Sequence, residues 1–225
     1  MPFSQILIFL PVLLFSVIIH EYAHGWMALR CGDPTARDAG RLTLNPIPHI
    51  DPFMTILLPL FLIISHSGFI IGGAKPVPVN PSLFRRGEKD GVLVAASGAA
   101  ANILLAVCAF FLSLIITIIY KLTGGSIIIA ALRFFNSVIF LNLVLANFNL
   151  LPIPPLDGSH ILAYFLKGEA KYAYLRLSRY GFMILIGVII LGDMLPIRGG
   201  LFSLLLAPSI SLIEAVTGVQ LSWLT

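Results

Sequence analysis

The sequence predicts an all-α integral membrane protein with about six transmembrane helices. Of its 225 residues, 58% are hydrophobic and only 11% are charged, and the mean hydropathy is +0.99. Soluble globular domains carry about 25% charged residues, so this composition excludes an ordinary soluble protein. In addition, long apolar runs alternate with short polar segments, as expected for helices that cross a bilayer and for the loops that join them.

The apolar runs place the helices along the chain. A helix of about 20 residues is long enough to cross the hydrocarbon core of a bilayer. The predicted helices cover about residues 3–29, 52–71, 92–120, 127–150, 180–195 and 200–216. Pro59 predicts a kink in the second of these helices, because proline cannot donate the backbone hydrogen bond that its position requires.

Two segments rich in proline interrupt this pattern. Residues 72–81 read GGAKPVPVNP, and residues 151–160 read LPIPPLDGSH. Proline lacks the backbone N–H and clashes with the preceding turn, so neither segment is expected to form a regular helix. Extended backbone is tolerated at membrane depth only where protein buries it or where it lines a wet cavity. Residues 72–84 are therefore expected to form a short extended or re-entrant element.

The basic residues indicate the topology. They cluster in residues 30–41, 85–89 and 167–179, which the positive-inside rule places in the cytoplasm. This rule also accounts for the net charge of +4, so no nucleic-acid partner is predicted. The partner that this composition predicts is the lipid bilayer.

Residues His20-Glu21-Tyr22-Ala23-His24 form an H-E-x-x-H motif inside the first apolar run. Positions i and i+4 share a face of a helix, so both imidazoles can reach one metal ion. Glu21 stands next to His20, where a carboxylate can take a proton from a metal-bound water. Ionisable side chains are costly in a bilayer, so three of them within five residues favour a metal site over a buried polar cluster.

A catalytic zinc takes three protein ligands and keeps a position open for water. Asp157 is the favoured third ligand, because it follows a proline-rich break and precedes Gly158, where the backbone can turn. The alternative is that Asp157 caps a helix that starts near Ser159. His66 and His160 are interpreted as structural. His49 and Asp51 are either loop hydrogen bonders, which is the favoured interpretation, or a gate near the site.

Three motifs, HEYAHG, GGAKPVPVNP and NLLPIPPLDG, together resemble the site-2 protease family of intramembrane zinc metalloproteases (peptidase M50). They occur in the family's order and lie within residues 19–160, about two thirds of the chain. The resemblance implies that His20, His24 and Asp157 bind Zn²⁺ and that Glu21 is the general base. It also implies that the enzyme cuts a transmembrane segment of a partner protein in or near the bilayer.

The resemblance also implies a single polytopic core domain over residues 1–225, in a minimal form without the PDZ or CBS domains of larger members. Such a bare core is typical of a prokaryotic plasma membrane. The basic clusters place the active site toward the cytoplasmic side. Regulated release of a membrane-tethered protein is the family's usual task. Substrate identity, cleavage position and oligomeric state are not specified by these motifs.

Two further residues are carried over on less evidence. Asn149 lies eight residues before Asp157, where the family has an Asn that would position the substrate backbone or stabilise the oxyanion. Asn102, in SGAAAN, resembles a small-residue motif with an Asn, although small residues also allow close helix packing. Residues 72–80 are expected to offer a strand edge to an extended substrate. Gly73 stands where many members have an aromatic residue.

The predicted reaction is peptide-bond hydrolysis, in which Glu21 accepts a proton from the zinc-bound water and returns it to the leaving amine. One alternative is a divalent-metal transporter that uses the same ligands as a transit site. Transport usually needs internal repeats or several polar stations along a path, and the last two predicted helices have almost no such polar residues. The other alternative is a non-catalytic membrane scaffold, which would need neither the ligands nor Glu21.

Overall fold

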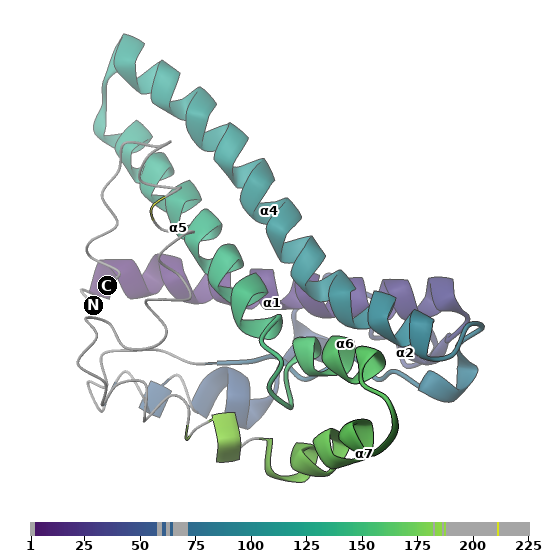
Figure 1. Cartoon of the computed structure of the whole chain (residues 1–225). Coiled ribbons are helices and arrows are strands. Elements are labelled where there is room, and N and C mark those ends of the chain that lie inside the picture. Colours follow the sequence, from purple (N-terminus) through teal and green to yellow (C-terminus); the bar gives the residue numbers. More distant parts are fainter. Residues whose placement is uncertain are drawn as a thin grey trace. The chain divides into compact units, whose positions relative to one another are not determined.

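The computed structural model describes residues 3–57, 60–61, 64, 72–181, 183–185, 187 and 211, and these residues form helices and irregular segments without a strand. Figure 1 shows the chain coloured along its sequence. The chain divides into two compact units, Met1–Asn102 and Ile103–Thr225. The two units are described in turn.

The first unit is built on one long helix, α1 (Phe3–Cys31), which confirms the first predicted helix. Its 29 residues span about 43 Å at 1.5 Å per residue, more than the hydrocarbon core requires. Gly32 ends the helix with φ 109°, a conformation that residues with a Cβ rarely adopt. The buried carboxylate of Asp33 then accepts a hydrogen bond from the Thr35 N–H at 3.0 Å and starts the short helix α2 (Thr35–Asp38).

The second predicted helix is described only in part. A 3₁₀ turn, η1 (Ile47–His49), precedes a π-helical turn, η2 (Pro52–Leu57). Residues 60, 61 and 64 are also helical. The rest of the predicted helix, including the kink expected at Pro59, lies outside the described residues.

Residues 72–80 form no regular helix, as predicted from their prolines. The segment ends where the side chain of Asn80 accepts a hydrogen bond from the Ser82 N–H at 3.2 Å and caps η3 (Pro81–Leu83). A few residues later, the Arg85 N–H donates to the carbonyl of Cys31 at 3.0 Å. The segment is therefore tied at its far end to the end of α1.

The helix α4 (Glu88–Thr123) begins in the first unit and continues into the second. Gly124 and Gly125, with φ of 64° and 115°, turn the chain into α5 (Ser126–Asn149). Within the second unit, an apolar cluster of Ala106, Ala109 and Ile139 joins the two helices. The Ser113 hydroxyl also donates to Asn136 Oδ1 at 3.1 Å, a type of bond that holds helices together in an apolar environment.

Two short helices follow α5, namely α6 (Asp157–Phe165) and α7 (Gly168–Leu177), and the 3₁₀ turn η4 (Ser178–Tyr180) comes after them. The expectation that all of residues 151–160 are non-helical was wrong, because α6 starts at Asp157. The prolines of this segment all precede Leu156, so none of them removes a hydrogen bond from the new helix. A Cβ on Gly158 would collide with the carbonyls of Leu150 and Leu151, so glycine lets α6 turn back onto the end of α5.

Three described helices are long and apolar enough to cross a membrane. They are Ile8–Cys31, Glu88–Thr123 and Ser126–Asn149. An all-α membrane protein is consistent with these spans, but six spans are not confirmed. The predicted helices at residues 180–195 and 200–216 lie largely outside the described residues.

Candidate metal centre

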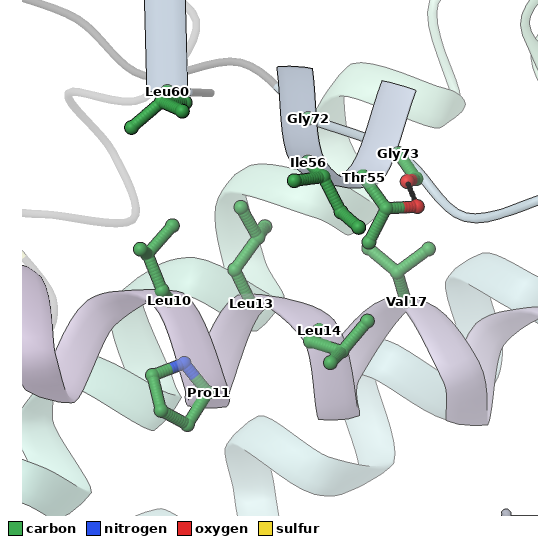
Figure 2. Close-up of a pocket in the computed structure, with 10 residues that line it drawn as sticks. All are labelled: Leu10, Pro11, Leu13, Leu14, Val17, Thr55, Ile56, Leu60, Gly72 and Gly73. Carbon is green, nitrogen blue, oxygen red and sulfur yellow. Dashed lines mark hydrogen bonds between the residues drawn. The ribbon is translucent and has the colours of Figure 1, made fainter. Parts of the chain in front are cut away.

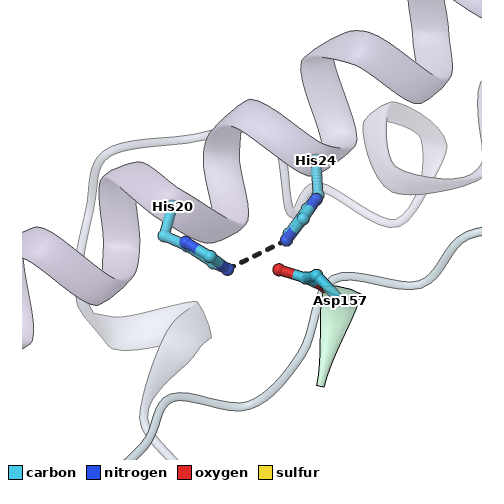
Figure 3. A group of neighbouring side chains, drawn as sticks. All are labelled: His20, His24 and Asp157. Atoms are coloured by element: carbon cyan, nitrogen blue, oxygen red, sulfur yellow. Dashed lines mark hydrogen bonds between the residues drawn. The ribbon is translucent and has the colours of Figure 1, made fainter. Parts of the chain in front are cut away.

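The two histidines of the H-E-x-x-H motif lie on one face of α1. Their ring centroids are 4.6 Å apart and the ring planes meet at 86°. The Nε2 atoms of His20 and His24 are 3.0 Å apart, and only 6% and 8% of the two residues are exposed. Figure 3 shows both rings pointing to the same side of the helix, with a dashed line between the two nitrogens. This is the convergence expected for positions i and i+4.

Acceptor oxygens fix the orientation of both imidazoles. His24 Nδ1 lies 2.7 Å from the carbonyl oxygen of Val94, and His20 Nδ1 lies 2.6 Å from Asn102 Oδ1. A carbonyl oxygen only accepts, so in the tautomer that fits these contacts Nδ1 carries the hydrogen and Nε2 carries the lone pair. Asn102 is itself held by a 3.3 Å hydrogen bond from its Nδ2 to the carbonyl of Ser16. Outer hydrogen bonds of this kind typically orient metal-binding histidines.

A glycine on α4 makes room for the histidine pair. A Cβ built on Gly98 would lie 2.5 Å from His20 Cε1 and from His24 Nε2, which is far inside van der Waals contact. Any side chain at this position would therefore displace the imidazoles. The neighbouring Ser97 hydroxyl donates to the Val94 carbonyl at 2.7 Å. The same oxygen is the hydrogen-bond partner of His24 Nδ1.

Glu21 is held by residues 72–80, the extended segment that precedes η3. Its Oε2 accepts a 2.7 Å hydrogen bond from the backbone N–H of Val77. A carboxylate has two oxygens and several acceptor positions, so this bond fixes the side chain while Oε1 can still accept a proton. The expected base is therefore oriented by backbone that lies 56 residues further along the chain.

The other predicted site residues belong to the second unit. Asp157 is the first residue of α6 and is partly buried, and the N-cap position is taken by Leu156. The alternative in which Asp157 caps a later helix was therefore wrong. Asn149 is the last residue of α5, and its Nδ2 donates to the carbonyl of Leu145 at 3.0 Å.

His49 and Asp51 make hydrogen bonds to nearby backbone, as expected for loop residues. His49 is fully buried and its Nε2 lies 2.9 Å from the carbonyl oxygen of Thr43. Asp51 Oδ1 accepts from the Phe53 N–H at 2.9 Å. His160 is exposed on α6, and His66 lies outside the described residues.

An apolar cavity of about 450 Å³ lies against the N-terminal half of α1, within the first unit. Figure 2 shows side chains of this helix facing η2 and the start of the extended segment. The dashed line in Figure 2 is the 2.6 Å hydrogen bond from Thr55 Oγ1 to the carbonyl of Gly73. The lining residues are Leu10, Pro11, Leu13, Leu14, Val17, Thr55, Ile56, Leu60, Gly72 and Gly73.

Comparison with known proteins identifies the family. Residues 114–191 match the family model of Peptidase family M50. YwhC of Bacillus subtilis, named as a provisional zinc metalloprotease, is 40% identical over 184 residues, which are 81% of this chain and 80% of YwhC. The chain belongs to peptidase family M50. Rip2 of Mycolicibacterium smegmatis, also named as a provisional zinc metalloprotease, is 30% identical over 192 residues, covering 84% of this chain and 70% of Rip2. No solved structure matches.

For this M50 member, sequence reasoning identified the motif but not its surroundings. Asn102 was expected at the site, and the structure places it behind His20, where it holds the ring. The roles of Gly98 and Val77 were missed. The small-residue run around Gly98 indicated close packing, but not that the two imidazoles fill this space. The Val94 carbonyl and the Val77 N–H are backbone groups, so no residue type could have indicated them.

Proposed function

We propose that this protein is an intramembrane zinc metalloprotease that hydrolyses a peptide bond in or near a transmembrane segment of a partner protein. The observation that supports the proposal is the pair of converging Nε2 atoms on α1, each on a ring whose Nδ1 faces an acceptor oxygen. The helix that carries them is a candidate membrane span. Membership of family M50 makes the chain a metallopeptidase, and zinc is the metal named for its relatives.

The donor set fits zinc. His20 and His24 offer two imidazole nitrogens, and we propose the carboxylate of Asp157 as the third ligand. Two imidazoles, one carboxylate and an open position are a common ligand set of catalytic zinc sites. Figure 3 draws the three residues of this proposed set. When bound, zinc supplies Lewis acidity that makes water nucleophilic near neutral pH and polarises the scissile carbonyl.

Glu21 carries the proton in the proposed mechanism. With Oε2 held by the Val77 N–H, Oε1 accepts the proton of the attacking water and then delivers it to the leaving amine nitrogen. The water oxygen first forms its C–O bond and leaves an oxyanion on the former carbonyl. The C–N bond breaks as this carbonyl re-forms and Glu21 protonates the amine nitrogen, which regenerates the Glu21 carboxylate. Asn149 keeps a second amide hydrogen beyond its bond to Leu145, which it can offer to the substrate backbone or the oxyanion.

The position of the motif on α1 supports a site near one membrane surface. His24 lies seven residues before the end of the helix at Cys31, or about 10 Å along its axis. The basic residues 30–41 follow this end, so the positive-inside rule favours the cytoplasmic side of a plasma membrane. We propose that water reaches the site from this side and that residues 1–225 act as one membrane core domain.

Metal analysis and cleavage of single-span substrates by the purified protein, with Glu21→Gln as the control, test the proposal. About one zinc per chain and cleavage by the wild type alone are expected. Cleavage by Glu21→Gln would refute the role of Glu21. Zinc binding without cleavage of any substrate, together with zinc flux into proteoliposomes, would instead support the transporter alternative.

A further inference from the structure

Hydrogen bonds to the backbone of residues 72–80 fix this segment along its length to the rest of the first unit. Three of these bonds anchor the two ends and the middle of the segment. Thr55 Oγ1 donates to the Gly73 carbonyl at 2.6 Å, and the Lys75 N–H donates to the His49 carbonyl at 2.8 Å. At the far end, the Asn80 N–H donates to Asp33 Oδ2 at 2.6 Å. The segment is therefore a rigid backbone support beside α1.

The prolines of this segment determine which N–H can reach Glu21. Pro76 and Pro78 carry no N–H, so Val77 has the only backbone donor between Lys75 and Val79. A residue before proline is also restricted to extended conformations, and both Lys75 and Val77 precede a proline. The sequence K-P-V-P thus presents one N–H on an extended backbone, and this N–H is the donor to Glu21.

The side chain of Val77 is also seated against α1. Val77 is 7% exposed, and a Cβ built on Gly25 would lie 3.1 Å from both Val77 Cγ1 and Ala36 Cβ. Gly25 is four residues after Glu21 and therefore shares its face of the helix. The glycine that follows His24 thus lets the extended segment approach α1 closely enough for the Val77 N–H to reach the carboxylate.

Arg41 bonds to the carbonyls of the two residues that precede Val77. The side chain is buried, with 8% of the residue exposed. Its Nη2 donates to the Lys75 carbonyl at 2.6 Å and more weakly to the Pro76 carbonyl at 3.4 Å. The Pro76 carbonyl and the Val77 N–H belong to the same planar peptide group, so a shift of one moves the other.

We infer that Arg41 is a positioning residue for Glu21. Through the carbonyls of Lys75 and Pro76 it fixes the peptide that donates the Val77 N–H, and this N–H holds the general base in place. The inference rests on the proposed function for its catalytic part. The link from Arg41 through Val77 to Glu21 is a property of the fold and can be measured without any cleavage.

The test compares Arg41→Ala and Arg41→Lys with Arg37→Ala in the full-length, zinc-loaded protein. Arg37 is a matched control, because its side chain is exposed on α2 and pairs with Asp38 at 2.9 Å. The measurements are hydrogen exchange of the Val77 amide in protein labelled with ¹⁵N-valine, kcat and KM on a cleaved single-span substrate, and zinc content.

In Arg41→Ala we expect the Val77 amide to exchange at least tenfold faster and kcat to fall about 10- to 100-fold, as when a reacting group is displaced by about 1 Å. KM and zinc content should change less than twofold. A lysine ammonium keeps the charge and has N–H donors for both carbonyls, but its side chain is one atom shorter than the path to Arg41 Nη2, so Arg41→Lys should recover part of both losses. Arg37→Ala should match the wild type.

Unchanged Val77 exchange in Arg41→Ala would overturn the inference, and so would a loss that appears in KM or zinc content with kcat preserved. If the wild type cleaves nothing while Val77 exchange still depends on Arg41, the proposed function fails and the positioning link stands. Should Arg41→Ala not fold, Val77→Pro removes the donor itself. It is compared with Val77→Ala, which keeps the N–H, and equal kcat values in this pair would also overturn the inference.

Discussion

Gly98 is the residue whose substitution most directly tests the geometry of the histidine pair. In Gly98→Ala, the new Cβ would start 2.5 Å from His20 Cε1 and His24 Nε2 and 2.6 Å from His20 Nε2. Ordinary contacts of this kind begin near 3.4 Å, so the rings and α4 must separate by about 1 Å. Both imidazoles are held from behind by 2.6 and 2.7 Å hydrogen bonds, so moving them away from Gly98 strains those bonds.

The expected magnitude follows from this displacement. Disturbing the outer hydrogen bonds of a metal ligand typically costs 10- to 100-fold in affinity, and a 1 Å misplacement of reacting groups can cost about 100-fold in rate. Gly98→Ala should therefore weaken zinc binding 10- to 100-fold and lower kcat/KM at saturating zinc by at least tenfold. Competition with a chromophoric zinc chelator measures the first quantity, and cleavage of a single-span substrate measures the second.

Gly91→Ala is the matched control on the same helix. A Cβ at Gly91 would meet only Phe84 Cε2, at an ordinary 3.9 Å. Alanine favours a helix by about 1 kcal/mol over glycine, so Gly91→Ala should be slightly more stable than the wild type and should bind zinc normally. Wild-type zinc affinity in Gly98→Ala would refute the proposed histidine geometry.

Three further predictions concern the supporting hydrogen bonds. Asn102→Ala removes the acceptor behind His20 and should weaken zinc binding 10- to 100-fold, whereas an unchanged chelator titration would contradict this role. Burial alone would raise the pKa of Asp33, but hydrogen bonds from the Thr35 side chain and the Asn80 N–H hold it below the ordinary 3.8. The stability that the Asp33 carboxylate contributes is therefore complete above pH 4 and is lost as the pH falls through the lowered pKa. Asp33→Asn should lower the unfolding temperature at pH 7 by a few degrees and make that temperature depend less on pH in the acid range. Unfolding temperatures of wild type and variant that fall in parallel with decreasing pH would disprove this. Ser113→Ala removes the bond to Asn136 and should destabilise the protein by about 0.6 kcal/mol, which denaturant unfolding in detergent can detect.

Local sequence patterns predicted the elements that depend on neighbouring residues. The apolar run of α1 and the i, i+4 spacing of His20 and His24 place two rings on one face, because helix geometry repeats every few residues. Pro76 and Pro78 exclude a helix in residues 72–80 for an equally local reason. The same rule misled at residues 151–160, since a helix can begin directly after a proline-rich segment, as α6 does at Asp157.

The sequence by itself determined that this is a helical membrane protein with two histidines and an adjacent carboxylate on one turn of its first helix. Only the tertiary structure decided how these groups are oriented. The oxygens behind His24 and His20 come from residues 70 and 82 positions away, and the donor to Glu21 comes from 56 positions away. Two of these three partners are backbone groups. Every residue has a backbone carbonyl, and nearly every residue has an N–H, so the residue type does not say which of these groups will face a given side chain. That is decided by how α1, α4 and the extended segment pack together.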